Sequence, residues 1–484
     1  MSMSQRKISS KKICAVILAV YAVCAVLFLV IARDQIIYTS DETYQLANSA
    51  QRDLGELTDG MEILQTFRSK HRYLKNVEGY FLTYGRENSG TVRLEVLDME
   101  DGSVLSESSA DLSQLGNGEW QTFALDSPID TWELKDGIVG LRFMFEGCEA
   151  GSTVTMTVQD IQTDGGSLTV NGEAVEGSSL CVGAVQYNDS GHAVWYPIAL
   201  GIGLAVLLVF CVWNILAEKK GKMTIGLRFL YMLERYDFLL RQLVSRDFKT
   251  KYKRSFFGVL WSLLNPLLTM GVQYVVYSRI FRFDIPAYPV YLLTGVVFFN
   301  FFTDSTTQAM NAITGNASLI TKVYVPKYIY PVSKVLSSSI NLFLSLIPLF
   351  LVAWLTGCGI SWAYLMIPFG LVCFLLFVTG VSFFLSAAMV FFRDIQFLWG
   401  VFTMLWMYAT PIIYPLSLLE GTFLLPFQRV NPMYYFMTFF RTIIMDGVSP
   451  EPTQYLMCLL SALIVLLLGG LFFRKTQDQF ILHI

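Results

Sequence analysis

The chain has 484 residues, of which 54% are hydrophobic and only 15% are charged. Soluble globular proteins carry about 25% charged residues, so this composition excludes an ordinary soluble domain. Several uncharged runs reach the roughly 20 residues that a helix needs to cross a bilayer. We therefore expect a polytopic α-helical membrane protein.

The small net charge of −3 conceals a strong asymmetry. Residues 33–195 hold 27 acidic and 10 basic residues, whereas the rest of the chain holds 11 acidic and 25 basic ones. Basic loops of membrane proteins face the cytoplasm. The asymmetry predicts a plasma-membrane protein whose acidic block is extracytoplasmic.

The N-terminus has the pattern of a retained membrane anchor. Residues 1–12 carry four cations and residues 13–32 follow without a charge. A signal peptide has a shorter apolar region of about 7–15 residues, followed by a small-residue cleavage site. We expect a cytoplasmic tail at 1–12 and a transmembrane helix at 13–32.

Residues 33–195 have the pattern of an all-β domain. After a short helical lead-in expected at 41–57, polar and apolar residues alternate in five segments. These segments are 91–98, 119–126, 138–146, 152–160 and 167–172. Period-two alternation between turn signals predicts an antiparallel β-sandwich. Because disulfides can form outside the cytoplasm, Cys148 and Cys181 would either form a disulfide or remain two free thiols.

The remaining chain predicts seven further membrane spans. A second span at 197–216 is followed by a basic amphipathic helix at 223–256, which we place in the membrane interface. The six-helix region 257–484 contains spans at about 257–281, 290–311, 335–356, 363–390, 396–418 and 454–473. Eight spans place both termini in the cytoplasm. The Pro-interrupted segment 420–452 is predicted to be re-entrant.

Phosphate-binding and hydrolytic motifs are absent from the sequence. It contains no G-x-x-x-x-G-K-[ST], no HExxH and no G-x-S-x-G, and with only three histidines we expect no zinc site. We therefore predict no metal, no cofactor and no enzyme activity in this chain. A transporter of this kind must use an ion gradient or a separate ATPase.

Two charged residues fall within the predicted spans. Arg279 lies near the end of its span, where its side chain can reach the interface. Asp304 lies mid-span among serines and threonines, so it is either a functional charge or a hydrogen-bonded helix contact.

Aromatic residues suggest two surfaces. Trp399, Trp406, Tyr408 and Tyr414 recur near one face of a span, which indicates either helix packing or a stacking surface for sugar rings. The loop 312–334 mixes aromatic and basic residues, which is typical of a docking surface or of a helix on the membrane surface.

A resemblance adds to these inferences. RDFKTKYKRSFFGVLWSLLNPLL, at 246–268, resembles the start of the membrane domain of type 2 ABC exporter permeases of the polysaccharide, teichoic-acid and O-antigen export branch. Matching stretches follow in the same order at 316–336, 391–415 and 431–443.

The resemblance implies a homodimer that works with two ATP-binding cassette subunits, which bind ATP and Mg²⁺. The substrate would be a polyprenyl-diphosphate-linked glycan. Membrane lipid would be a further partner, and no nucleic-acid partner is expected. It implies a gate helix whose residues meet the diphosphate: Arg246, Lys249, Lys251, Tyr252, Lys253 and Arg254. Clustered cations attract phosphates at an interface, although ordinary positive-inside anchoring explains them equally well.

Two further sets of residues follow from the same resemblance, and a third set extends the aromatic surface described above. A coupling helix at 316–330 would present Lys322, Tyr324, Lys327 and Tyr328 to the ATPase. The re-entrant segment would include Asn431, Tyr434, Tyr435 and Arg441. The aromatic residues expected along the channel are Trp261, Trp399, Trp406, Tyr408 and Tyr414.

The acidic β block departs from the minimal family pattern. It looks like a jelly-roll of the carbohydrate-binding kind, and the alternative is a structural spacer or dimerisation domain. Two other classes of function stay open from the sequence: a membrane sensor with a ligand-binding outer domain, and an ion-coupled carrier.

Overall fold

The computed structural model describes residues 10–39, 41–47, 51–222, 224–253, 257–281, 285–322, 325–419 and 421–483. The chain divides into two compact units. Asp34–Trp195 form the β unit, and the residues up to Arg33 and from Tyr196 onward form the helical unit.

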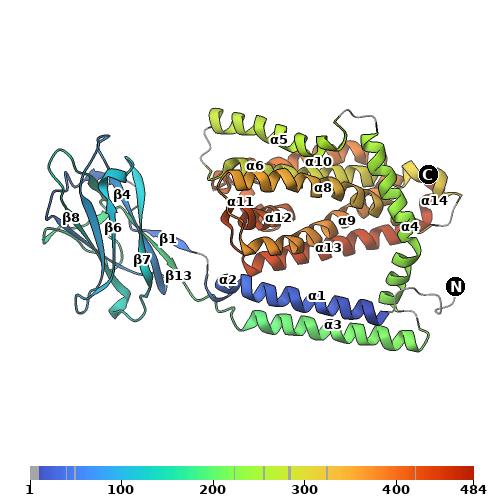
Figure 1. Ribbon diagram of the computed structural model, residues 1–484, viewed down its shortest axis with the longest axis horizontal. Coiled ribbons are helices and arrows are strands. Elements are labelled where there is room, and N and C mark those ends of the chain that lie inside the picture. The colour runs from blue at the N-terminus through green and yellow to red at the C-terminus, as the bar shows by residue number, and fades with distance from the viewer. Residues whose placement is uncertain are drawn as a thin grey trace. The chain divides into compact units, whose positions relative to one another are not determined.

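The β unit contains two antiparallel sheets (Figure 1). In the first, the order is β1-β13-β4-β9-β12, with β7 added beside β4 and β2 beside β9. In the second, the order is β11-β10-β3-β8-β5-β6. The strands of the first sheet are β1 Glu42–Gln45, β2 Arg52–Asp53, β4 Tyr73–Leu82, β7 Glu119–Asp130, β9 Thr155–Gln159, β12 Ser179–Leu180 and β13 Val182–Tyr187. Those of the second are β3 Glu62–Arg68, β5 Thr91–Asp98, β6 Val104–Asp111, β8 Ile138–Glu146, β10 Leu168–Val170 and β11 Glu173–Ala174.

Alternating apolar residues of both sheets build the core of this unit. Phe123 of β7 meets Phe143 of β8 edge to face, with ring centroids 5.9 Å apart, so side chains from the two sheets interlock. Burial of such side chains stabilises each by about 1.5–3 kcal/mol. The prediction of an all-β domain is confirmed.

Two details of the β unit differ from expectation. The helical lead-in at 41–57 is wrong, because β1 pairs with β13 and β2 pairs with β9 instead. The only helix at this end of the unit, as far as the structure describes it, is the short α2, Arg33–Ile37. Cys148 and Cys181 are both buried thiols rather than a disulfide.

Among the described residues, the helical unit contains nine helices of 14 residues or more. They are α1 Ser10–Ile31, α3 Trp195–Lys219, α4 Ile225–Tyr252, α5 Trp261–Tyr274, α6 Tyr288–Met310, α8 Ile329–Leu355, α9 Ile367–Phe391, α10 Ile395–Ala409 and α13 Pro452–Thr476. Shorter helices are α7 Ala317–Ile320, α11 Leu424–Gln428, α12 Pro432–Arg441 and α14 Phe480–His483.

Within the described residues, six helices are long and apolar enough to cross a membrane: α1, α3, α5 with its flanking turns, α8, α9 and α13. The polytopic α-helical fold class is confirmed. The other two predicted spans correspond to α6, which carries polar residues, and to α10, which has 15 residues. The number of eight spans stays a prediction.

The predicted span 396–418 ends early. α10 stops at Ala409, and Thr410 is extended (φ −100°, ψ 138°). Pro411 follows, and a residue before proline is disfavoured in the helical region because the proline ring clashes with its backbone.

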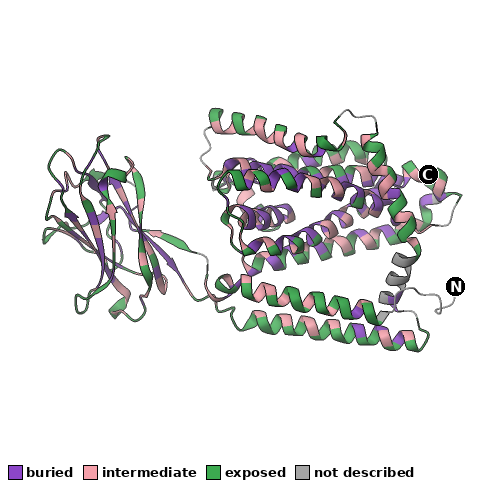
Figure 2. Ribbon diagram, in the orientation of Figure 1, coloured by how far each residue is buried: buried purple, intermediate pink, exposed green. Residues whose placement is uncertain are grey.

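Helices α6, α8, α9, α12 and α13 share the core of the helical unit. Figure 2 shows buried residues along α9 and α12, whereas α1 and α3 are largely exposed. At one point α9 and α13 touch through their backbones, because a Cβ on Gly469 would lie 2.0 Å from the carbonyl oxygen of Gly380. Small residues allow this close approach in membrane helices.

Candidate functional site

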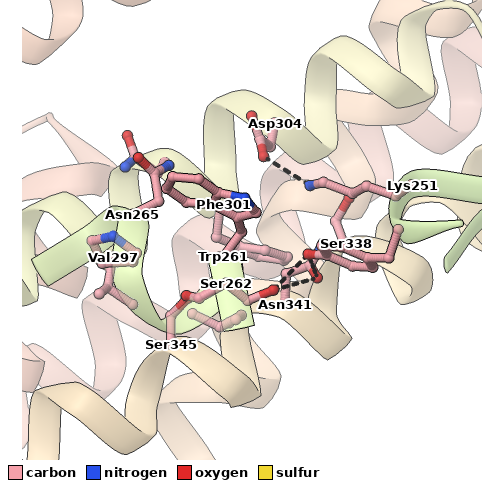
Figure 3. Close-up of a pocket in the computed structure, with 14 residues that line it drawn as sticks. Lys251, Trp261, Ser262, Asn265, Val297, Phe301, Asp304, Ser338, Asn341 and Ser345 are labelled. Atoms are coloured by element: carbon pink, nitrogen blue, oxygen red, sulfur yellow. Dashed lines mark hydrogen bonds and ion pairs between the residues drawn. The ribbon is translucent and has the colours of Figure 1, made fainter. Parts of the chain in front are cut away.

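A cavity of about 260 Å³ opens where the end of α4 meets α5, α6 and α8. Figure 3 shows its lining side chains, which come from these four helices. The lining is Lys251, Tyr252, Trp261, Ser262, Asn265, Pro266, Val297, Asn300, Phe301, Asp304, Ser338, Asn341, Leu342 and Ser345. Figure 1 shows α4 running across the ends of the longer helices, which brings its last turn to this opening.

Helical spacing explains why so many polar side chains meet here. Ser338, Asn341 and Ser345 lie three and seven positions apart, and therefore share one face of α8. Asn300 and Asp304 are four apart on α6. Ser262 and Asn265 on α5 are three apart. Polar groups within membrane helices are costly and usually face the bundle interior or a water-filled cavity.

The last turn of α4 closes one side of the cavity. The Lys251 Nζ lies 3.5 Å from the Asp304 Oδ2, and both side chains are substantially exposed, at 40% and 61%. Tyr252 donates to the Asn341 Oδ1 at 2.7 Å, and its hydroxyl also lies 2.5 Å from that of Ser262. The turn is therefore attached to three other helices.

One turn earlier, α4 is attached again by an ion pair of another kind. The Lys334 Nζ of α8 lies 2.8 Å from the Asp247 Oδ2, and these side chains are only 21% and 10% exposed. Arg246 donates to Asn316, in the segment that precedes α7, at 3.4 Å. Both contacts link α4 to the residues around the predicted coupling segment.

The predicted gate residues thus fall into separate groups. Lys251 and Tyr252 line the cavity, whereas Arg246 contacts Asp247 and Asn316. The side chains of Lys249 and Lys253 are exposed. Arg254 lies outside the described residues.

Among the predicted channel aromatics, only Trp261 belongs to the cavity lining. Trp399 donates to Thr306 at 3.2 Å and Trp406 donates to Asn431 at 2.8 Å, and both pack against Phe302. These are the helix-packing contacts of the alternative interpretation. Tyr408 is exposed, and Tyr414 donates to its carbonyl oxygen at 2.6 Å.

The predicted coupling residues also lie in different surroundings. Lys322 is exposed. Lys327 instead donates to the Gln477 carbonyl oxygen just beyond α13, and its ammonium lies 5.7 Å from the Phe480 ring centre. Tyr328 packs partly buried against a small apolar cluster. Tyr324 is outside the part of the chain that the structure describes.

The predicted re-entrant segment contains α11 and α12, which meet at Asn431. This buried amide donates to Thr410 and Gln428, accepts from Trp406, and caps α12 by accepting from the Met433 backbone N–H. Tyr435 donates to the Arg429 carbonyl oxygen at 2.7 Å, and the Tyr434 ring packs on that of Tyr435.

Arg441 ends α12 and joins three chain segments. Its guanidinium donates to the carbonyl oxygens of Pro411 (2.7 Å), Ile412 (2.8 Å) and Tyr291 (3.2 Å). It also lies 3.4 Å from the Tyr291 ring centre, a close cation–π contact. Asn431 and Arg441 therefore hold the turn after α10 in place rather than line the cavity.

Sequence reasoning missed most of the cavity. Asp304 and Lys251 were each predicted as candidates, but their pairing was not, and the polar faces of α5 and α8 were not recognised. Their serines and asparagines at helical spacing were the available signal. Within the described residues, no group of three His, Cys, Asp or Glu side chains could hold a metal ion.

Long apolar helices around a polar, charge-lined opening define the class of the protein, a multi-pass membrane protein. Residues 239–445 match the ABC-2 type transporter family model. The chain is 32% identical over 257 residues to the O-antigen export system permease protein RfbA of Myxococcus xanthus, covering 98% of that protein and 52% of this chain. It is 30% identical over 247 residues to a protein of the same name from Klebsiella pneumoniae, covering 93% of that protein and 50% of this chain.

The chain therefore belongs to the ABC-2 type transporter family. The resemblance to permeases of the polysaccharide export branch, first noted from residues 246–268, is confirmed.

Proposed function

We propose that this permease exports a polysaccharide or teichoic acid carried on a polyprenyl diphosphate across the cytoplasmic membrane. The observation that carries the proposal is the polar cavity with Lys251 at its opening. Relatives named for O-antigen export support a glycan as substrate. The charges outside residues 33–195 are mainly basic, which supports cytoplasmic termini and an extracytoplasmic β unit.

The cavity lining suits this substrate in two ways. Its asparagine and serine side chains can replace the water that sugar hydroxyls lose on entry, while Trp261 offers an aromatic face to a sugar ring. The Lys251 ammonium can form charge-assisted hydrogen bonds to phosphate oxygens, which are stronger than neutral ones.

Energy would come from ATP and Mg²⁺ bound by a separate subunit, with two permeases forming a homodimer. Motion at the predicted coupling segment can reach α4 through Arg246 and Asn316, and through Asp247 and Lys334. Because Lys251 follows Asp247 by one turn of the same helix, movement of α4 changes the opening of the cavity. In this proposal the β unit binds the exported glycan.

Replacing Lys251 tests the diphosphate role. K251Q keeps a polar side chain, one atom shorter than lysine, but removes the charge. Hydrogen bonds to charged groups contribute about 1.5–3 kcal/mol, so export in cells should fall roughly 10-fold to 100-fold while membrane insertion is unchanged. The matched control is R241Q, which removes an exposed α4 cation paired with Asp237. Normal surface-glycan export by K251Q would refute the role.

A second experiment tests the energy source. The permease should co-purify with a subunit that carries a Walker A loop, and mutation of that loop should abolish export. Continued export with the mutated loop would instead support an ion-coupled carrier.

A further inference from the structure

Aromatic side chains lie side by side on the outer face of the first sheet of the β unit. Trp120 of β7 stands directly opposite Tyr80 of the neighbouring strand β4 (Figure 1). Phe81 and Phe123, on the same two strands, point into the core. Because side chains alternate between the two faces of a strand, Tyr80 and Trp120 project from the outer face. Their ring centroids are 5.3 Å apart, and Trp120 is 38% exposed.

Tyr84, in the turn after β4, extends this aromatic surface toward β2. Its ring is 43% exposed, and its backbone has a φ of 57°, which is uncommon for a bulky residue. The Tyr84 hydroxyl donates to the Asp53 Oδ2 of β2 at 3.4 Å, and the Arg86 guanidinium lies 5.0 Å from the ring centre. Arg86 in turn pairs with Glu56 and donates to the Thr153 carbonyl oxygen. An exposed ring is thus held in a strained conformation, as is often seen at ligand sites.

Carboxylates lie among these rings. Glu78 precedes Tyr80 by two positions and therefore shares its face of β4. Gly183 stands opposite Glu78 on β13, and a Cβ at that position would lie 3.2 Å from the Glu78 Oε2. The cores of protein–protein interfaces are aromatic but poor in charged residues, so this mixture argues against a protein partner. It fits a sugar, whose C–H groups pack on aromatic rings and whose hydroxyls donate to carboxylates.

The charge of the β unit restricts the kind of glycan. Residues 33–195 contain 27 acidic and 10 basic residues, a net charge of −17. At least seven of the ten basic residues already pair with carboxylates: Arg68, Arg72, Lys75, Arg86, Arg93, Lys135 and Arg142. A polymer with a phosphate in every repeat would be repelled by this field and would find few free cations. An uncharged polysaccharide meets no such repulsion.

We propose that Tyr80, Trp120 and Tyr84 form a binding site for a neutral glycan, which excludes polyanionic teichoic acids as its ligand. This inference rests on the proposed function, in which the β unit binds the exported glycan, and it narrows the substrate to an uncharged polysaccharide. The sugar rings stack on the aromatic side chains, and Glu78 and Asp53 accept hydrogen bonds from sugar hydroxyls. The only charge on such a substrate is the diphosphate at its lipid end.

Retention of glycan on the immobilised, detergent-purified full-length chain tests the site. The probes are the surface glycans of the native cells, separated by anion exchange into a neutral and an anionic fraction. The unaltered chain should retain the neutral fraction in preference. W120A should weaken this retention about tenfold, the factor expected when a ligand no longer covers one aromatic ring. W120F, which keeps a ring, should be intermediate.

The matched control is W132A, which removes a 70% exposed tryptophan located just beyond the other end of β7. It should leave retention unchanged. An equal loss in W132A, or preferential retention of the anionic fraction, would overturn the proposal. Undiminished retention in W120A together with a smaller oligomer would instead identify this face as a contact between copies of the chain. Y84A, expected to weaken retention similarly, is the second variant should W120A destabilise the β unit.

The export assay of K251Q separates this inference from the proposed function. Loss of export in K251Q, together with undiminished retention in W120A, would refute the glycan site and leave the transport function standing. Normal export by K251Q, together with weakened retention in W120A, would refute the diphosphate role of Lys251 and keep the glycan site.

Discussion

In the β unit, the Glu95 carboxylate is 6% exposed and lies between two arginines, whereas Asp304 in the helical unit is 61% exposed and faces one lysine. Arg142 stands opposite Glu95 on the neighbouring strand, so strand pairing fixes their contact. The Lys251–Asp304 pair joins two helices at an opening. A shielded ion pair that is fixed by strand register therefore stabilises the fold, whereas an exposed ion pair at a cavity remains available to a ligand.

Structural polar contacts around α10 and α12 in the helical unit are of another type. Arg441 and Asn431 bind backbone carbonyl oxygens and uncharged side chains. Such contacts provide hydrogen-bond partners for the backbone groups after α10, where the chain is irregular and does not form helical hydrogen bonds. Charges in this unit are therefore used both for structure and for function, and variants can separate the two uses.

Arg441 should give the largest effect. R441A leaves three carbonyl oxygens without their donor and removes the contact with the Tyr291 ring, so we expect a loss of about 3 kcal/mol or more. R441K, which lacks the planar fork, should be intermediate. Thermal unfolding of the detergent-purified protein measures both, with exposed R429A as the control. A normal melting temperature for R441A would show that the segment needs no such anchor.

Glu95 should come next. E95A leaves Arg93 and Arg142 without their shared carboxylate, which should destabilise the β unit by about 3 kcal/mol. E107Q removes only the exposed partner of Arg93 and should cost less than about 1 kcal/mol. Limited proteolysis of residues 34–195 in the full chain would rank the variants. Equal cleavage of both would remove the distinction between shielded and exposed pairs.

Tyr252 should give a smaller change. Y252F removes a hydroxyl that donates to Asn341, a hydrogen bond worth about 1 kcal/mol, so export should fall a few-fold without loss of folding. Y236F on the same helix, away from the cavity, is the control. Export in Y252F as low as in K251Q would mean that the hydroxyl, and not the charge, dominates binding.

The smallest effect is a pH dependence of the β unit. A hydrogen bond from Arg72 lowers the pKa of Asp130 below its ordinary value of 3.8. A carboxyl with a depressed folded-state pKa contributes stability that is present above the ordinary value and is lost as the pH falls through the folded-state pKa. Unfolding of this unit should thus be insensitive to pH from 7 to about 5 and become easier below about 4.

R72M should weaken this acid dependence, since Asp130 then titrates near its ordinary pKa in both states. Circular dichroism melts of the full chain at several pH values would measure it. The same slope in R72M and the unaltered chain would assign the acid sensitivity to other carboxylates.

Much of the β unit could be predicted from local pattern. The segments 91–98 and 138–146 are β5 and β8 with the same bounds, because alternation of side chains marks a half-buried strand. The strand β1 could not be predicted, since its partner β13 lies far along the chain. Nothing in residues 42–45 themselves reveals that pairing.

The cavity shows a similar limit. Lys251 and Trp261 were predicted from the basic stretch and its resemblance, but the sequence does not say which helix faces which. Trp399 and Trp406 share one helical face whether that face meets lipid, a sugar or α6. Lys327 was expected at a docking surface, and its contact with the Gln477 carbonyl oxygen depends on where α13 ends.

The contact between Gly380 and Gly469 has a consequence for the order of assembly. In lipid, the hydrophobic effect does not drive helices together, so α9 and α13 associate through close backbone packing and weak attractions. α13 is synthesised after α9, α10 and α12, so the Gly380 face of α9 lacks its partner helix until α13 enters the membrane. A bulkier residue at either position would interrupt biogenesis at that late step, after most of the helical unit has formed.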